Sequence, residues 1–263
     1  MNKIQFPIYC INLTKEINRR KIMEEQFKKY NLEYIFCNSI DANKLIFTKN
    51  EMNTNSEERI GEYNIDNITT INFHIKSKDY YQHIKKNGHI GCSLSHLYYI
   101  HKGYINNLNT MVMCEDDISF EYMSKWKNSI DSIIKNAPID WKIIKLHCSN
   151  IIIMKKYNKN EKYIKIPKNS VKFWSTGIYL INKNGMQDIV NKYYNNISNK
   201  YELFQDFPVA DYLLHQIDGV YYYSIPLVKN NNLDHNFKSD VAYSDVLTNE
   251  EKKGIEFVEN FYR

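Results

Sequence analysis

Short apolar runs alternate with segments of helical periodicity along most of the chain, and this alternation constrains the fold more than any other feature of the sequence. Near the N-terminus, a helical pattern at 18–32 separates two strand-like runs at 6–13 and 33–40. The alternation continues with strands predicted at 110–114, 141–146, 173–181 and 220–225 and helices at 92–105, 123–137, 184–194 and 206–217. Strands that alternate with helices form sheets with helices on both faces, so the sequence predicts an α/β fold with a mainly parallel sheet.

The length and continuity of the chain favour a single domain over residues 1–263. A chain of 263 residues can form one large domain or two small ones, and no internal repeat or linker divides this one. Residues 42–87 are polar and irregular, most of all 48–64, which predicts a flexible loop or an inserted lobe. Apolar residues recur at helical spacing near the C-terminus and predict a helix within 243–263 that docks on the body of the protein or on a partner.

Composition and charge limit the classes of partner. The chain has 43% hydrophobic and 25% charged residues, as soluble globular proteins do, and its net charge of +5 comes from lysines scattered among acids, so nucleic acid is not an expected partner. The five cysteines form no C-x-x-C pair and most lie in apolar runs, which predicts buried free thiols in a reducing compartment. Without a signal peptide or an apolar run long enough to span a bilayer, we expect a soluble, cytoplasmic protein, with peripheral membrane contact left open.

Three adjacent acids, Glu115, Asp116 and Asp117, follow the apolar run at 110–114. Like charges about 4 Å apart repel by about 4 kcal/mol at an effective dielectric constant of about 20, so the fold has to compensate them. In an extended segment Glu115 and Asp117 face one way and Asp116 the other. Because ligands bind at the carboxyl ends of strands in α/β sheets, two converging carboxylates suit Mg²⁺ or Mn²⁺, which can hold a diphosphate. The alternative is a solvated turn, or the start of a helix beyond Phe120, where negative charge is favourable.

Two further polar groups are predicted to lie near the same edge of the sheet. Arg19 and Arg20 follow the first strand at the start of a helix, where guanidinium groups can pair with phosphate. Ser95 and His96 lie near the start of the helix predicted at 92–105 and can donate hydrogen bonds there. The alternatives are a solvated helix face for the arginines and simple helix capping for the serines.

Four segments, in their order and spacing, resemble glycosyltransferase family 25. They are INLTKEINRRKIMEEQFKKYNLEYIFCNSIDA (11–42), GHIGCSLSHLYYIHK (88–102), MVMCEDDISF (111–120) and STGIYLINKNGMQDI (175–189), with looser matches at 206–214 and 225–231. The family includes bacterial lipooligosaccharide galactosyltransferases and the procollagen galactosyltransferases. The resemblance implies a GT-A-like, Rossmann-type fold and a metal-dependent, inverting transfer of a hexose, such as galactose or glucose, from a UDP-sugar donor to a hydroxyl of a glycan or protein acceptor.

The resemblance also implies roles for individual residues. EDD matches the family's DXD-type motif, which places Glu115 and Asp117 near a Mn²⁺ or Mg²⁺ ion and Asp116 near the donor ribose or sugar. The other residues expected at the donor are Asn12, Leu13, Arg19, Arg20, Ser95, His96, Trp174 and Thr176. Burial in the core is the alternative for Trp174. The sequence departs from the family at His89, where an acid is common, and in PVADYLL, which only approximates the usual PVD pattern.

The catalytic base and the last metal ligand are less constrained by the sequence. An inverting transfer needs a carboxylate to take the acceptor proton. Asp211 is the first candidate because it points away from the apolar stripe of its predicted helix, and Asp206 is the second, although it is better explained as the N-cap of that helix. A solvated surface acid is the alternative for Asp211. Similar enzymes complete the metal shell near the C-terminus, where His235 is preferred over Asp234, and an exposed loop histidine is the alternative.

Two other functions remain open at this level. A non-catalytic nucleotide-sugar or glycan-binding protein on the same fold would bind UDP without turnover. A metal-dependent phosphohydrolase that uses the same acids would release sugar phosphate or inorganic phosphate instead of intact UDP.

Overall fold

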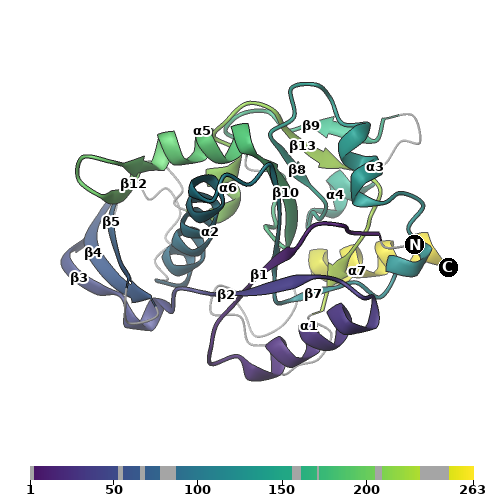
Figure 1. The fold of residues 1–263 in the computed structure, drawn as a ribbon, viewed down its shortest axis with the longest axis horizontal. Coiled ribbons are helices and arrows are strands. Elements are labelled where there is room, and N and C mark those ends of the chain that lie inside the picture. Colours follow the sequence, from purple (N-terminus) through teal and green to yellow (C-terminus); the bar gives the residue numbers. More distant parts are fainter. Residues whose placement is uncertain are drawn as a thin grey trace.

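A seven-stranded sheet forms the centre of the structure, a computed structural model that describes residues 3–52, 56–65, 69–77, 87–155, 161–170, 172–204, 209–231 and 249–263. In order across the sheet, the strands are β2 (Tyr34–Asn38), β1 (Ile8–Asn12), β6 (Thr110–Glu115), β10 (Ile178–Asn182), β8 (Ile143–Lys145), β13 (Val220–Tyr223) and β9 (Tyr163–Lys165). Five of them run in one direction, while β10 and β9 run in the other (Figure 1). The predicted α/β class with a mainly parallel sheet is therefore confirmed.

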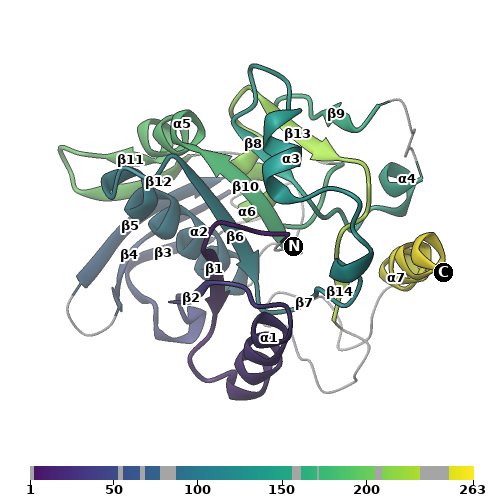
Figure 2. The same cartoon turned by 45° about the vertical axis from the view of Figure 1, so that its right-hand side comes forward.

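Helices cover both faces of this sheet because side chains alternate along each strand. The helices on one face are α1 (Ile17–Lys29) and α3 (Ile130–Lys135), and those on the other are α2 (Asn87–Ile105) and α5 (Lys183–Tyr193) (Figures 1 and 2). In β6, Val112 and Cys114 pack toward the first pair of helices, whereas Met111 and Met113 pack toward the second. Because Glu115 continues this alternation, its side chain belongs to the face that α2 covers.

A second, smaller sheet lies beside the central one. Its five strands, in order, are β11 (Tyr194–Asn195), β12 (Lys200–Phe204), β5 (Thr69–Ser77), β4 (Glu57–Ile65) and β3 (Ile46–Met52), and the short helix η1 (Ala42–Lys44) precedes β3. The prediction that residues 48–64 are the most loop-like part of the chain was wrong, because most of their described residues belong to β3 and β4. Polar side chains there lie on a solvent-facing side, as Asn64 is exposed between the buried Tyr63 and Ile65.

Helix α2 lies between the two sheets (Figure 1). Leu94 and Leu97 are buried, as their spacing predicts, but Tyr98 and Tyr99 are buried as well, so the helix has no broad solvent-facing side there. A Cβ atom at Gly91 would lie 2.6 Å from the backbone oxygen of Ile40, so glycine permits the close approach of α2 to the segment after β2. Packing from two sides fixes α2 firmly, which suits a helix that presents side chains to a site.

Two short helices replace the single helix predicted at 123–137. They are η2 (Met123–Lys125) and α3, and between them Trp126 has an extended backbone with a ψ of 129°. Ser129 begins α3 as its N-cap, because its side chain accepts a hydrogen bond from the backbone of Ser132. The buried residues of this segment are Met123, Trp126, Ile130 and Ile133. Their spacing therefore predicted burial correctly, but it did not predict that the helix is interrupted.

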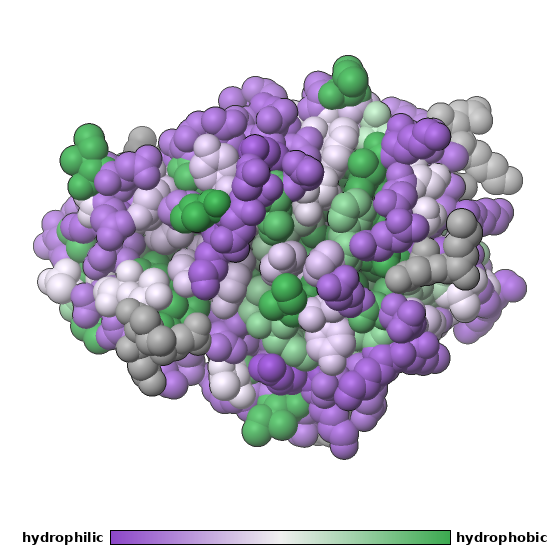
Figure 3. All heavy atoms as spheres, viewed as in Figure 1, coloured by the Kyte–Doolittle hydropathy of each residue, from purple (hydrophilic) through white to green (hydrophobic). Residues whose placement is uncertain are grey.

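Short elements and the C-terminal helix complete the described chain. Strand β7 (Ile118–Ser119) pairs with β14 (Lys229–Asn230), and α4 (Ile151–Met154) packs against α7 (Asn249–Tyr262). In α7, Ile255 and Val258 are buried. Nowhere in the described ranges is there a helix with both the length and the apolar character needed to cross a membrane. Hydrophilic residues cover much of the molecular face in Figure 3, and more apolar ones gather near its middle.

Candidate active site

The three acids lie at the carboxyl end of β6, next to the end of the neighbouring parallel strand β1. Strand β6 ends at Glu115, which pairs in register with Ile11 of β1. Asn12, the next residue of β1, is 1% exposed and lies beside the acids. The sequence placed the acids at this edge because they follow an apolar strand, and the structure brings the first strand to the same edge.

Asp116 joins the first strand to the first helix. Its Oδ2 accepts a hydrogen bond from Nδ2 of Asn12 at 2.6 Å, and its Oδ1 lies 3.1 Å from Nη1 of Arg19. Burial raises the pKa of Asp116 to about 6, although Arg19 and Asn12 act to lower it. The other side-chain atom of Asn12, Oδ1, is buried and has no hydrogen-bond partner among the described residues. This corner therefore combines a fixed cation, Arg19, with a hydrogen-bond acceptor, Oδ1 of Asn12, that is available to a ligand.

Asp117 is the acid whose carboxyl group is least satisfied by its surroundings. Its Oδ1 is buried without a hydrogen-bond partner in the described part of the chain. Burial, together with the neighbouring Glu115 and Asp116, raises the pKa of Asp117 to about 8. A divalent cation would supply both the missing partner and the opposite charge, and carboxylate oxygens are the ligands that Mg²⁺ and Mn²⁺ prefer. The residues present therefore fit a hard cation at this position.

Glu115 is held on the α2 face of the sheet. Its Oε1 lies 3.1 Å from Nε2 of His96 and accepts a hydrogen bond from Oγ1 of Thr176. The other ring nitrogen of His96, Nδ1, lies 2.8 Å from the hydroxyl of Tyr179 in β10. Burial acts to raise the pKa of Glu115, but the contacts with His96 and Thr176 outweigh it and hold the pKa below its ordinary value. The carboxylate of Glu115 is thus ionised and fixed.

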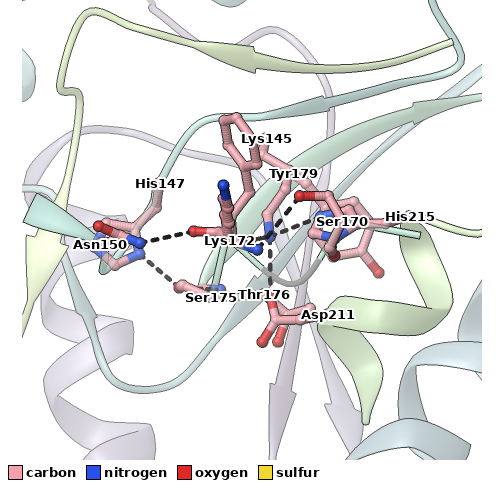
Figure 4. Close-up of polar contacts among 12 residues, drawn as sticks. Lys145, His147, Asn150, Ser170, Lys172, Ser175, Thr176, Tyr179, Asp211 and His215 are labelled. Atoms are coloured by element: carbon pink, nitrogen blue, oxygen red, sulfur yellow. Dashed lines mark hydrogen bonds and ion pairs between the residues drawn. The ribbon is translucent and has the colours of Figure 1, made fainter. Parts of the chain in front are cut away.

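A buried lysine of β8 organises the next part of the site, beyond β10 (Figure 4). Lys145 is fully buried, and its Nζ lies 3.0 Å from Oδ1 of Asp211 in α6 (Ala210–Leu214) and 3.3 Å from Nε2 of His215. Nζ also donates a hydrogen bond to the backbone oxygen of Phe173. Burial raises the pKa of Asp211 above its ordinary value, although Lys145 acts in the opposite direction. Asp211 is therefore a paired, largely buried carboxylate and not the solvated surface acid that was its alternative.

The segment before β10 is held in an unusual conformation. Ser175 has a φ of 101°, in the region that favours glycine, and its Oγ accepts a hydrogen bond from the backbone of Gly177 and lies 2.6 Å from Nδ1 of His147. Backbone strain of this kind costs about 1–3 kcal/mol and persists where the surrounding structure demands it. Here it accompanies the placement of Thr176 against Glu115.

Buried neutral histidines make the protein sensitive to acid. Burial and, secondarily, Lys145 lower the pKa of His147 to about 4, whereas an unfolded histidine titrates near 6.5. The unfolded chain therefore binds a proton first as the pH falls, so the stability that neutral His147 provides is present above about pH 6.5 and is lost toward pH 4. In His147→Gln, we expect this loss between pH 7 and pH 4.5 to shrink by roughly 2–3 kcal/mol. Urea unfolding of both proteins at the two pH values measures it, and equal losses would contradict the prediction.

The structure gathers some of the predicted residues and not others. Asn12, Arg19, His96, Asp116 and Thr176 contact one another or the acids. The hydroxyl of Ser95 instead donates to the backbone of Gly91 and accepts from the backbone of Ile40, so Ser95 braces α2 and does not face the acids.

The other predicted residues have different surroundings or lie outside the described chain. Arg20 stacks over the ring of Phe36, Leu13 contributes a backbone turn to Glu16, and Trp174 is 39% exposed, which excludes burial in the core. Val209 holds the N-cap position of α6 that the sequence assigned to Asp206. Asp206 and His235 lie outside the described residues.

Two polar residues of the site were missed by sequence reasoning. Lys145 stands in the apolar run WKIIKL, and a charge flanked by Ile144 and Leu146 inside a predicted buried strand was the available signal. His215 follows α6, and its Nδ1 lies 2.9 Å from the backbone oxygen of Ser170. Burial, and then Lys145, lowers the pKa of His215 to about 3, so its ring is neutral. The neutral ring donates from Nδ1 to Ser170 and accepts at Nε2 from Lys145.

Comparisons with known proteins bear on the identity of the chain. The model of glycosyltransferase family 25, an LPS biosynthesis protein family, matches residues 5–209. A Haemophilus influenzae protein named "Putative glycosyltransferase" is 30% identical over 161 residues, which are 61% of this chain and 47% of that protein, so the chain spans about half the length of this relative. A crystal structure of a glycosyltransferase involved in the glycosylation of the major capsid of PBCV-1 aligns with 84% of this chain and 91% of its own. The two chains are 12% identical, and the TM-score is 0.31.

The family match extends over most of the chain and includes the first strand, helix α2, the acids and the segment from Thr176 through α5. These are the segments on which the resemblance was based, and that prediction is confirmed. The chain belongs to glycosyltransferase family 25.

Proposed function

We propose that this chain is a metal-dependent, inverting glycosyltransferase that moves a hexose from a UDP-sugar donor to a hydroxyl of a glycan or protein acceptor. Membership of family 25 supports glycosyl transfer. The main support for a metal ion and a UDP-sugar donor is the corner formed by Asn12, Arg19 and the three acids. There, Oδ1 of Asp117 is buried with no hydrogen-bond partner among the described residues, and Asn12 and Arg19 hold the neighbouring Asp116 in place.

The donor side of the proposal rests on the edge formed by β1 and α1. Arg19 provides a guanidinium cation that is 9% exposed. It can pair with a phosphate of the donor or with the acids beside that phosphate. Oδ1 of Asn12 is an acceptor, and ribose hydroxyls are donors. Asp116 itself can accept from a ribose hydroxyl once the nucleotide replaces water. These three residues would select a nucleoside diphosphate over a free sugar.

Glu115 and Asp117 would hold the divalent ion, which would neutralise the charge of the departing diphosphate. The chain returns to this place after β14, because the backbone nitrogen of Asn231 donates to the backbone oxygen of Asp117 at 2.6 Å. His235 follows Asn231 by a few residues in the sequence and remains our proposed third ligand.

Asp211 is the proposed base for the acceptor. In a single displacement, the acceptor oxygen attacks C1 of the sugar from the side opposite the diphosphate. As the new bond forms, the bond from C1 to the diphosphate oxygen breaks, UDP leaves with the electron pair, and Asp211 takes the hydroxyl proton. Burial favours Asp211 for this task because a raised pKa strengthens a carboxylate as a base. Asp206 remains the second candidate.

A donor screen tests this function. The purified chain is incubated with UDP-glucose, UDP-galactose and related donors, with Mn²⁺, with Mg²⁺ or with EDTA, and the nucleotide products are separated by chromatography. We expect UDP to form from at least one donor with metal, by slow hydrolysis or by transfer, and its formation to stop with EDTA. Thermal shifts with the same donors would identify the one that binds, since a ligand of the native state raises its apparent stability.

The same experiment separates the two alternative functions. Donor binding without any UDP formation would favour a non-catalytic nucleotide-sugar-binding protein. Release of sugar phosphate or inorganic phosphate would favour a phosphohydrolase. Either result would overturn the proposal of glycosyl transfer.

A further inference from the structure

A second set of metal-ligating side chains lies beside the acids. Cys92, His96 and Glu115 each bring one ligand atom to within 4.8 Å of the others. Cys92 and His96 are four residues apart on α2 and so share one side of the helix, and Glu115 meets them from the end of β6. His96 is 1% exposed, whereas Cys92 is partly exposed and is the most accessible of the five free cysteines. The three ligands are thus of different chemical types and share one edge of a site that solvent can reach.

We propose that Cys92, His96 and Glu115 bind a thiophilic divalent cation of the Zn²⁺ class, and that this ion competes with the hard cation proposed at Glu115 and Asp117. Zinc prefers thiolate sulfur, imidazole nitrogen and carboxylate oxygen, and a site with three protein ligands leaves a fourth position open. Mg²⁺ and Mn²⁺ favour oxygen ligands and have little affinity for a thiolate. The same corner of the protein would therefore take different metals on its two sides.

The surroundings of His96 suit a metal ligand. Its Nδ1 lies 2.8 Å from the hydroxyl of the fully buried Tyr179, which fixes the plane of the ring. Without metal, Nε2 lies 3.1 Å from Oε1 of Glu115 and can donate its proton there. When a metal binds, the ring proton sits on Nδ1 and is donated to Tyr179, which leaves the lone pair of Nε2 for the metal. Metal-bound histidines commonly donate their second nitrogen in this way. The hydroxyl of Thr176 holds Glu115 from another direction.

Metal binding here is a simple exchange of partners. The S–H bond of Cys92 breaks, its proton leaves to solvent, and the sulfur binds the metal. His96 loses its Nε2 proton to solvent and takes up a proton at Nδ1, so the ring stays neutral while Nε2 binds the metal. Glu115 gives up its contact with His96 for the same ion. No oxidant or reductant takes part.

The competition follows from the shared ligand, and this part of the inference rests on the proposed function. Glu115 cannot serve both ions in full, so a zinc ion on the α2 side would weaken the Mn²⁺ or Mg²⁺ site. We expect micromolar Zn²⁺ to inhibit sugar transfer even when Mn²⁺ is in excess, and a chelator to restore the activity.

Cobalt absorption tests the binding itself without any need for turnover. The metal-free protein is titrated with Co²⁺, whose bond to a thiolate gives a charge-transfer band in the near ultraviolet that oxygen and nitrogen ligands do not give. We expect a saturable band in the wild type that Zn²⁺ abolishes, no band in Cys92→Ser, and an unchanged band in Cys37→Ser. Cys37 is a matched control because it is another free cysteine, buried in β2, with its Sγ 3.9 Å from the backbone oxygen of Ile35.

Two further variants guard against an artefact of folding. In Tyr179→Phe, which removes only the hydroxyl that orients His96, we expect the affinity for Co²⁺ to fall by about tenfold or more. In His96→Gln, we expect the band to weaken or disappear, with far-ultraviolet circular dichroism showing that the fold is kept. Absence of the band in the wild type, or its persistence in Cys92→Ser, would overturn the proposed site.

The activity measurement is kept separate. Zinc inhibition in the wild type, with Cys92→Ser resistant relative to its own uninhibited rate, would support the competition. A cobalt band without any effect of Zn²⁺ on transfer would overturn the competition. Failure to detect transfer with any donor would contradict the proposed function, whereas the cobalt result would still decide the metal site.

Discussion

Asp117→Asn should lower the rate of sugar transfer by about a thousandfold, because a metal ion at a leaving diphosphate is worth several kcal/mol and each 1.4 kcal/mol changes a rate tenfold. The substitution removes one anionic ligand of the proposed cation and leaves the size of the side chain nearly unchanged. It should also remove the thermal shift that Mn²⁺ causes. Steady-state kinetics and melting curves with and without Mn²⁺ measure both effects.

The same variant should be more stable than the wild type when metal is absent. The pKa of Asp117 is raised to about 8 by burial and by Glu115 and Asp116. A carboxyl group with a raised pKa favours the folded state at low pH, and this contribution is lost as the pH rises from about 4 through 8. Asparagine does not ionise, so the gain in melting temperature should grow across this range, by about 2–4 °C for each kcal/mol.

Asn12→Asp offers a contrast, because it adds a charge beside Asp116 where Asp117→Asn removes one. It should destabilise the metal-free protein. A fall in the stability of Asp117→Asn at pH 9, or full activity with Mn²⁺, would count against the proposed metal site.

Lys145→Met should be the most damaging single change among the polar residues of the site. Breaking a buried ion pair from one side leaves the other charge without a partner, which costs about 3–5 kcal/mol. Lys145 is fully buried between β8 and α6, and Asp211 and His215 both lie within 3.3 Å of its Nζ. We expect urea denaturation to show a loss of this size.

The effect on catalysis follows from the charge of Lys145, which we regard as a positioning residue. Lys145 acts to lower the pKa of Asp211, so its removal should raise that pKa. Because a base works in its ionised form, the acid limb of the pH profile of kcat should move to higher pH in Lys145→Met. An unchanged pH profile would exclude Asp211 as the base that Lys145 influences.

A double-mutant cycle separates this pair from simple damage to the core. Lys145→Met combined with Asp211→Asn removes both charges, so the double variant should be about 2–3 kcal/mol more stable than the sum of the two single changes predicts. Its transfer activity should stay low because the proposed base is missing. Strict additivity of the two stability changes would show that the ion pair is not what the single variants lose.

The sequence predicted the parts of the fold and of the candidate site that depend on local pattern. Strands β1 and β6 and helix α1 follow from apolar spacing, and the ends of strands locate Asn12 and the acids. The extended conformation predicted for 115–117 was wrong beyond Glu115, because β6 ends there and Asp116 and Asp117 form a turn, but Asp116 still lies beside Arg19. These placements need only the periodicity of neighbouring residues and the rule that parallel strands end at one edge.

The remaining parts depend on contacts between distant segments. Lys145 pairs with Asp211, which is far away in the sequence, and no residue near Lys145 in the chain predicts that contact. The hydroxyl of Ser95 accepts a hydrogen bond from the backbone nitrogen of Ile40, and the position of Ile40 depends on how β2 ends. The small sheet looked like a loop because one side of its strands faces solvent, so a polar composition hid the alternation of buried residues in β5 at Ile71, Phe73 and Ile75.

The small sheet is assembled from two stretches of sequence that are far apart. Strand β12, which comes after α5, pairs in parallel with β5, and Tyr201 of β12 reaches back to Nδ1 of His101 on α2 at 3.0 Å. Removal of residues 42–87 would leave β12 without β5, one of its two neighbours, and would expose one side of the helix that carries His96. Residues 42–87 therefore do not form an independent unit. An exchange of this region between relatives would have to include residues 194–204 as well.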